Sequence, residues 1–336
     1  MSGAGVAAGA GGQHDGQESG NPASGTCGHH PQYRRRRRRA PRAPVRFRVN
    51  PADERRHAPG EGALWGESWY VDFSRDDGLG GFVRLGLYPN LGVAWWWTHL
   101  LVPGRHLVAV RDHDVPLPRG QGLEVRADGL WADLICETPL EHWSIGLEAF
   151  GVGLDDPAEA WGDEWGERLP VGLDLEWEAA GPPAEGLAPG PAPGPEGGGY
   201  TQAGRVRGDL LIGDARIDFD GPGLRARSWG TCDWWSAAGA GHWAAWHDDA
   251  GRTVLVGGPG WPGGPSVELV DLKVTADGLP TGASYRLDGQ PVEATVLGLA
   301  PILLGAPGRS ARLARALCRF TGLGGEGTGW AEWIGV

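Results

Sequence analysis

The stretch Val171-Gly172-Leu173-Asp174-Leu175-Glu176-Trp177-Glu178 alternates strictly between two kinds of residue. Its odd positions are apolar, and its even positions are glycine or acidic. Successive side chains of a β-strand point to opposite faces, so the pattern predicts a strand with one buried and one solvated face. The same period of two runs through nearly every readable part of the chain, which favours antiparallel sheets.

Two dipeptides predict tight turns between such strands. Asp128-Gly129 separates residues 123–126 from residues 130–136, and Asp288-Gly289 leads into residues 291–296. An Asp-Gly pair between alternating apolar residues is a strong short-range signal for a hairpin. The remaining predicted strands are 81–88, 106–111, 143–150, 205–212, 215–220, 242–247, 253–256, 267–274 and 330–334. Only residues 310–320 suit a helix.

Glycine and proline together account for 87 of the 336 residues. Ordinary proteins contain about 7% glycine and about 5% proline, so this excess indicates turns or disorder and argues against a mainly helical protein. The chain also contains 18 tryptophans, all between Trp65 and Trp333. The first 64 residues therefore differ in composition from the rest, and the chain consists of a tail and a body.

The Pro- and Gly-rich residues 181–199 interrupt the strand pattern of the body. Their composition predicts a linker or a long surface loop. On either side, residues 50–180 and 200–336 each contain about seven short predicted strands, which is typical of antiparallel barrels or sandwiches. Residues 1–49 offer almost nothing apolar to bury, so we expect a disordered tail rich in glycine and arginine. The sequence thus predicts an all-β protein with two consecutive domains.

The composition of the whole chain indicates a strongly biased coding sequence, in which an upstream start codon is easily assigned by mistake. Met1 is the only methionine, and 29 of the 30 basic residues are arginine. We expect translation to begin near Val45 or Val49.

Charge and cysteine content exclude several classes of protein. Residues 1–60 carry a net charge of +7, and residues 61–336 carry −19, so the acidic body would repel a phosphate backbone and we expect no nucleic-acid partner. No stretch of eighteen apolar residues and no complete export signal is present, so we expect a cytoplasmic protein without a transmembrane segment. The four cysteines are widely spaced without a C-x-x-C pair, which supports neither a zinc site nor a disulfide framework.

Several tryptophans occur in groups. A single tryptophan usually fills a core, but neighbouring strand residues point to opposite faces, so three in a row cannot all serve one core. Some must line a cavity, an interface or the outside. A barrel of about eight strands can hold one small ligand, and an aromatic lining suits an apolar one. The groups are Trp95-Trp96-Trp97, then Trp229, Trp234 and Trp235, then Trp243 and Trp246.

Residues 217–249 combine five tryptophans with several carboxylates and two histidines. A carboxylate pressed against indole rings is poorly solvated, which raises its pKa and lets it donate a proton at neutral pH. Indole faces can also stabilise a developing cation. These ingredients suit protonation of an alkene followed by capture of the carbocation. Asp220 and Asp248-Asp249 also read as solvated turn residues, so Asp233, between Cys232 and Trp234, is the better candidate.

The segment Ala226-Arg227-Ser228-Trp229-Gly230-Thr231-Cys232-Asp233-Trp234 resembles the signature of the family of carotenoid 1,2-hydratases (hydroxyneurosporene synthases) and AttH proteins. That signature has the form D-H-x-W-G, followed closely by an Asp-Trp or similar pair. Residues 67–70, 85–90 and 327–333 also resemble a bacterial branch of this family. The resemblance covers roughly residues 50–336.

The resemblance implies a pair of lipocalin-like (calycin-type) barrels and an isoprenoid or otherwise apolar ligand. Relatives include hydratases that add water to an isolated double bond and lipocalin-like enzymes that template the cyclisation of polyenes. Where the hydratase pattern has Asp and His, this chain has Ala226 and Arg227, and only Trp229 and Gly230 match. Arginine stays protonated and cannot transfer protons, so the acid/base histidine of the family is missing.

Three functions remain open. In the first, the chain is a hydratase (hydro-lyase) or cyclase of an apolar substrate, with Asp233, His242 or Glu332 as the proton donor. In the second, it is a non-catalytic carrier of an isoprenoid, steroid or polyketide-like molecule, with Arg227 holding a carboxylate or hydroxyl end. Glycan binding is the third, and it is disfavoured because the tryptophans lie beside apolar strand positions. The missing histidine favours binding or a modified reaction.

The predicted ligand-binding residues are Arg227, Trp229, Trp234, Trp235, Trp243 and Trp246. We expect no cofactor, because no G-x-G-x-x-G or P-loop sequence opens a helix. We also expect no metal site, because His106 and His113 would face opposite sides of their strand and loop.

Overall fold

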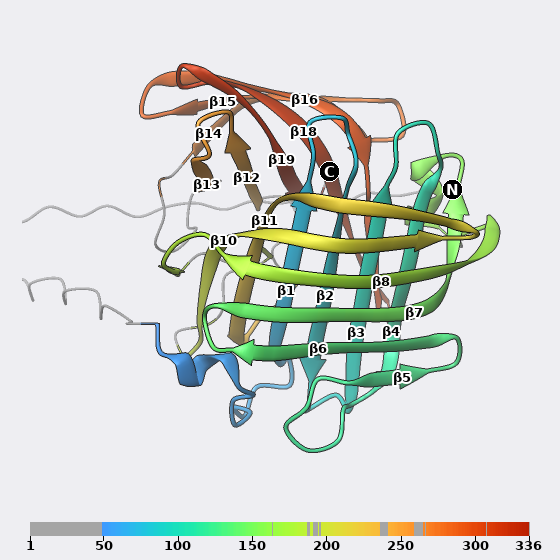
Figure 1. Ribbon diagram of the computed structural model, residues 1–336. Helices are drawn as coiled ribbons and strands as arrows, with labels where there is room; N and C mark the ends of the chain where they lie inside the picture. Colours follow the sequence, from blue (N-terminus) through green and yellow to red (C-terminus); the bar gives the residue numbers. More distant parts are fainter. Residues whose placement is uncertain are drawn as a thin grey trace, which may run out of the picture. The chain divides into compact units, whose positions relative to one another are not determined.

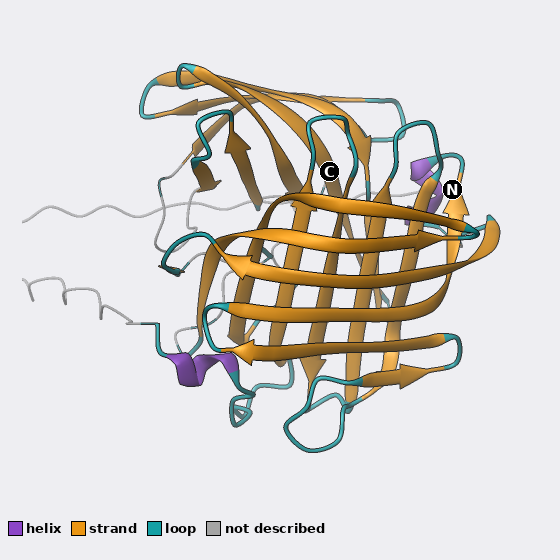
Figure 2. Cartoon of the chain, in the orientation of Figure 1, coloured by secondary structure: helices purple, strands orange, loops and turns teal. Residues whose placement is uncertain are grey.

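The computed structural model describes residues 49–162, 164–186, 189–190, 194, 196–235, 241–258, 265, 267–306 and 308–335. These residues form antiparallel β-structure throughout, apart from two short 3-10 helices, η1 (Pro51–Glu54) and η2 (Pro157–Trp161) (Figure 2). The predicted all-β class is therefore confirmed. The predicted tail, up to residue 48, lies outside the described residues.

The first sheet has eleven strands in the order β4-β3-β2-β1-β11-β10-β8-β7-β6-β5, with β9 paired to β10. β4 also pairs with β7, so the strand order returns on itself and closes a barrel. In Figure 1, β1–β4 run steeply across the direction of β6–β8. The strands are β1 (Trp65–Ser74), β2 (Gly80–Tyr88), β3 (Val93–Leu101), β4 (Leu107–Pro116), β5 (Val125–Ala127), β6 (Leu130–Thr138), β7 (His142–Leu154), β8 (Glu167–Ala179), β9 (Ala184–Glu185), β10 (Gly198–Ile212) and β11 (Ala215–Thr231).

The second sheet has eight strands in the order β13-β12-β19-β18-β16-β15-β14, with β17 paired to β18. It curls into a second barrel-like shape, so the prediction of two consecutive antiparallel barrels is confirmed. Its strands are β12 (His242–Asp248), β13 (Thr253–Gly257), β14 (Val267–Val274), β15 (Pro280–Leu287), β16 (Gln290–Leu299), β17 (Ile302–Ala306), β18 (Arg309–Gly322) and β19 (Gly325–Ile334).

The predicted border between the two halves needs correction. β10 and β11 follow the Pro- and Gly-rich residues 181–199, but they pair with β8 and β1 of the first sheet. The chain changes from one sheet to the other between Thr231 and His242. Residues 181–199 join neighbouring strands of one sheet, so their composition marks a long connection and not a domain border.

Three large apolar clusters fill the described fold, β1–β3 contribute to the first two, and a small fourth cluster joins Trp65, Tyr200 and Trp229. Trp69, Trp96 and Phe73 pack inside the first barrel. Trp95 and Trp97 point the opposite way and pack against side chains of β12, β18 and β19. The expectation that three consecutive tryptophans cannot share one core is therefore confirmed. A third cluster covers the other face of the second sheet.

Local sequence accounts for most of the turns and for one error. Both predicted Asp-Gly hairpins form, between β5 and β6 and between β15 and β16. Residues 310–320, predicted as a helix, belong instead to β18, which pairs with β16, β17 and β19. Alanine and arginine favour helices, but three-sided strand pairing overrides that intrinsic preference.

Candidate functional site

The face of the first sheet that meets the second sheet carries polar and aromatic side chains in rows. Tyr70 of β1 lies opposite Arg84 of β2, and Arg84 lies opposite Trp97 of β3. Directly opposed strand residues have Cβ atoms about 5 Å apart, so these three side chains are neighbours. The inward-facing Trp69 and Trp96 alternate with them and fill the barrel.

Arg84 is a buried guanidinium that lacks an ionic partner within the described residues. Its Cζ lies 4.5 Å from the ring centre of Trp97 and 5.0 Å from that of Trp234. Nη2 donates a long hydrogen bond of 3.4 Å to the Tyr88 hydroxyl, and Nε and Nη1 have no hydrogen-bond partner among the residues that the structure describes. Buried donors without acceptors cost stability, so this guanidinium has unused binding capacity.

A small cavity lies beside this guanidinium. It measures about 20 Å³ and is lined by Arg84, Tyr88, Trp229, Trp234 and residues around them. Gly86 makes room for the guanidinium, because a Cβ there would come within 2.6 Å of Arg84 Nη1. A cavity of this size holds about one water molecule. The space beside the guanidinium is thus small, and its lining combines the aromatic rings with polar residues that include Glu67 and Ser68.

A second buried polar group lies on the same face. The Tyr70 hydroxyl donates to Asp72 at 2.8 Å, and the Leu224 amide donates to the other carboxylate oxygen at 3.2 Å. From the second sheet, Arg315 forms an ion pair with Glu332, which also accepts from Trp243 Nε1 at 2.9 Å. Every one of these side chains is almost completely buried.

Burial changes the protonation of two groups on this face. It raises the pKa of Asp72 to about 7, although hydrogen bonds from Tyr70 and Leu224 and the charge of Arg315 act in the opposite direction. Asp72 is therefore partly protonated near neutral pH. Burial also lowers the pKa of His99 to about 3. His99 is neutral, and its Nδ1 donates to the Ala300 carbonyl at 3.3 Å.

Arg227, predicted as a ligand-binding residue, projects into the barrel and is fully buried. It forms an ion pair with Glu67 at 3.1 Å and donates to the carbonyl oxygens of Asp53, Arg55 and Ser68. Each of its three nitrogens thus has a partner within the chain. Arg84, on the other face of the sheet, has two nitrogens without an acceptor among the described residues.

The other predicted residues fall into two places. Trp229 and Trp234 line the small cavity, and Trp234 Nε1 donates to Tyr88 at 3.0 Å. Trp235 packs edge-on against Trp95, and its backbone amide donates to Asp233 at 3.0 Å. Trp243 and Glu332 bond to each other beside Asp72 and Arg315.

His242 and Trp246 point to the opposite face of β12. Trp246 stacks on Phe320 at a centroid distance of 4.5 Å. His242 Nε2 is buried and has no hydrogen-bond partner within the described part of the chain, and burial lowers the pKa of this ring. Because successive residues of a strand point to opposite faces, His242 and Trp246 lie on the other face of the second sheet from Trp243 and Glu332.

Sequence reasoning did not select Tyr70, Asp72, Arg84, His99 or Arg315. The available signal was the alternation of β1 and β3, where polar residues stand between inward apolar ones. Such residues read as a solvated face until a second sheet is known to cover them.

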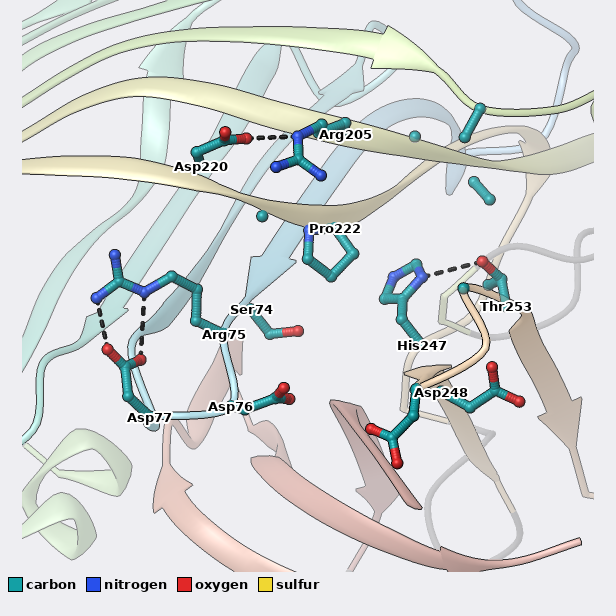
Figure 3. A pocket seen from close by; sticks show the side chains of 16 residues that line it. Ser74, Arg75, Asp76, Asp77, Arg205, Asp220, Pro222, His247, Asp248 and Thr253 are labelled. Carbon is teal, nitrogen blue, oxygen red and sulfur yellow. Dashed lines mark hydrogen bonds and ion pairs between the residues drawn. The ribbon is translucent and has the colours of Figure 1, made fainter. Parts of the chain in front are cut away.

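An open cleft of about 770 Å³ lies elsewhere, where the end of β1 approaches the β12–β13 turn (Figure 3). Most of the polar side chains that line this cleft bond to one another. Arg75 pairs with Asp77, Arg205 pairs with Asp220, and His247 bonds to Thr253. Asp248, expected to be a turn residue, accepts from the backbone amides of its own turn.

Within the described ranges, no group of three or more His, Cys, Asp or Glu side chains could hold a metal ion. Over the same ranges, no helix has the length and apolarity needed to cross a membrane.

One family model and one solved structure match most of the chain. A family model described as Domain of unknown function (DUF7064) matches residues 50–335. The sequence matches none of the curated proteins. The AttH-type protein NE1406 of Nitrosomonas europaea superposes with a TM-score of 0.55 at 14% identity, covering 88% of this chain and 99% of that chain.

Two further solved structures are similar at lower scores. Kievitone hydratase from Nectria haematococca gives a TM-score of 0.48 at 11% identity, covering 81% of this chain and 89% of that chain. CghA with Sch210972 gives a TM-score of 0.46 at 12% identity, covering 80% of this chain and 88% of that chain.

Proposed function

The chain belongs to the family described as Domain of unknown function (DUF7064), and from that premise we propose that it binds a small, largely apolar molecule whose oxygen-bearing end is held by Arg84. The observation that carries the proposal is the buried guanidinium of Arg84, with two nitrogens that have no acceptor. A carbonyl or carboxylate oxygen would supply the missing acceptor. Hydrogen bonds from a charged donor are among the strongest in proteins.

The surroundings of Arg84 support an apolar body for this ligand. Trp97 and Trp234 flank the guanidinium, Trp229 lines the same cavity, and Trp95 follows Trp97 on the same face. Because the cavity holds about one water, a larger ligand has to displace indole rings. Binding should therefore change tryptophan fluorescence.

A second candidate function, proton-initiated hydration or cyclisation, is favoured by Asp72. Its carboxyl group is partly protonated near neutral pH and bonds to Tyr70, the cross-strand neighbour of Arg84. In a hydration, the acid would give its proton to one alkene carbon, directly or through the Tyr70 hydroxyl. Water would then add to the carbocation and return a proton to the carboxylate, so no oxidant or reductant is needed.

Substitution of Arg84 tests the binding proposal. Arg84→Met removes the charge and keeps an unbranched apolar side chain, so binding of retinoic acid should weaken about tenfold or more, a change of about 1.4 kcal/mol. Affinity is read from quenching of tryptophan fluorescence. Retinol lacks the carboxylate, so the substitution should weaken its binding less than that of retinoic acid.

Arg309→Met is the matched control, because Arg309 also stacks on a tryptophan, Trp235 at 5.0 Å, but is exposed. Equal retinoic acid affinity in the wild type and in Arg84→Met contradicts the proposal.

A further inference from the structure

The segment of residues 50–57 crosses one end of the first barrel through η1. Asn50 caps η1 by accepting from the Ala52 amide at 2.9 Å, and Asp53 accepts from the Asn50 amide at 2.8 Å. In Figure 1, η1 (blue) lies near the turn that joins β6 and β7. Of these eight residues only Glu54 is buried, so a single carboxylate is the inserted side chain of the segment.

Glu54 enters a site with the features of a carboxylate receptor. Arg225 of β11 donates to both of its oxygens, at 2.8 and 2.7 Å, and the Leu140 amide adds a third hydrogen bond at 2.9 Å. Both side chains of this ion pair are at most 2% exposed. A two-pronged contact from a buried guanidinium selects a planar carboxylate over other acceptors.

The walls of this site are aromatic. The Arg225 guanidinium lies 5.2 Å from the ring centre of Trp143, 4.9 Å from that of Trp177 and 5.5 Å from that of Tyr200. Among the described residues, Arg225 Nε has no hydrogen-bond partner, and the Tyr200 hydroxyl lies next to Glu54 and Arg225. The site therefore has polar capacity that Glu54 leaves unused, next to apolar rings.

The remaining contacts of the segment are polar or peripheral. Arg227 donates to the carbonyl oxygens of Asp53 and Arg55, at 3.3 and 2.9 Å, and His57 stacks on Trp229. Arg56 also donates to the carbonyl oxygens of Pro118 and Gly120, and the His57 amide donates to Glu67. The segment is therefore anchored by polar contacts on both sides of Glu54, and none of its apolar side chains is buried.

We infer that this end of the first barrel is a binding site for an apolar carboxylic acid, which Glu54 occupies in this structure as an internal ligand. The incoming carboxylate takes the place of Glu54 on Arg225 and Leu140, and its apolar part lies along Trp143, Trp177 and Tyr200. Glu54 is tethered nearby at high effective concentration, so it competes with the acid and raises the concentration needed for binding. Binding of the acid therefore releases residues 50–57.

Removal of Glu54 in the full chain tests this inference, with sodium decanoate as the probe. In Glu54→Ala, decanoate at constant ionic strength should raise the thermal midpoint saturably, at a concentration at least tenfold below that needed for the wild type. Decanol, which lacks the charge, should not do so. Glu54→Ala/Arg225→Gln should respond no more than the wild type, because any binding of decanoate at Arg84 is common to all of these proteins.

Glu61→Ala is the matched control, because Glu61 is exposed and lies just after the segment. If Glu54→Ala is unfolded without ligand, the same titration is read as recovery of the near-ultraviolet circular dichroism of the tryptophans. Three results would each overturn the inference. The thermal midpoints of Glu54→Ala and Glu61→Ala could respond equally to decanoate, or Glu54→Ala could respond equally to decanol and decanoate. An unfolded Glu54→Ala that decanoate fails to refold would be the third.

Discussion

Four charged side chains, Asp72, Arg84, Arg315 and Glu332, are buried where the two sheets meet. Burying a charge costs several kcal/mol unless the charge is paired. Arg315 and Glu332 compensate each other. Asp72 can take up a proton, because burial raises its pKa to about 7, whereas arginine stays charged. Within the described residues, Arg84 is therefore the one of these four side chains that has no ion-pair partner and cannot lose its charge.

Asp72 should make stability depend on pH in a defined direction. Its pKa is about 7 in the folded state and near 3.8 when unfolded, so the folded state binds more protons between these values. The stabilising contribution is fully present below pH about 4 and is lost as the pH rises to about 7, with an upper limit of about 4 kcal/mol. Asp72→Asn should flatten this part of the profile, measured by urea unfolding between pH 4 and 8.

Asp174→Asn is the control for this experiment, because Asp174 lies on the exposed face of β8. Its profile should follow that of the wild type. Parallel profiles for the wild type and Asp72→Asn would show that Asp72 ionises normally.

At the scale of strands and turns, Asp288 and Gly289 determine the conformation of one hairpin. Both have positive φ, 49° and 79°, as the tight turn between β15 and β16 requires. A Cβ on Gly289 would meet nothing within 4 Å, so its substitution acts through the backbone alone.

Gly289→Ala should therefore cost about 1–2 kcal/mol of unfolding free energy, the penalty of left-handed backbone for a side chain. Gly122→Ala is the matched control, since Gly122 also has open space but no positive φ. Denaturant unfolding of both variants measures the difference. A loss of similar size in the two variants would refute the role of the turn conformation.

The sequence predicts elements of this kind well and longer-range features poorly. Alternation and Asp-Gly pairs identify most of the strands and both hairpins, because these signals are local, but they do not identify β1, β3 or β17. The alternation in β18 is hidden by alanine and arginine, whose helical preference yields only when partner strands are present. The sequence does not single out Asp72 and Arg84, because nothing local reveals that β12, β18 and β19 cover this face of the first sheet.

At the scale of the whole described chain, the first sheet depends on residues that follow the 181–199 connection. β1 pairs with β11, and β8 pairs with β10. A fragment of residues 49–180 loses both partners and leaves two strand edges unpaired.

A fragment of residues 49–235 keeps every strand of the first sheet and should show β-type circular dichroism, whereas residues 49–180 should aggregate. Circular dichroism and size-exclusion chromatography distinguish the two outcomes. If the fragment of residues 49–180 is folded and monomeric, the domain border predicted from composition is correct.

The pairing of β1 with β11 also bears on how the chain is made. Ser68 and Ser228 bond across this seam at 2.7 Å, although 160 residues separate them in the sequence. Ribosomes add about 5–20 residues per second, so β1 waits on the order of ten seconds for its partner strand. During that delay a strand that ends up buried on both faces is available to chaperones and to other nascent chains. The rate of translation through residues 75–231 should therefore influence the yield of native protein.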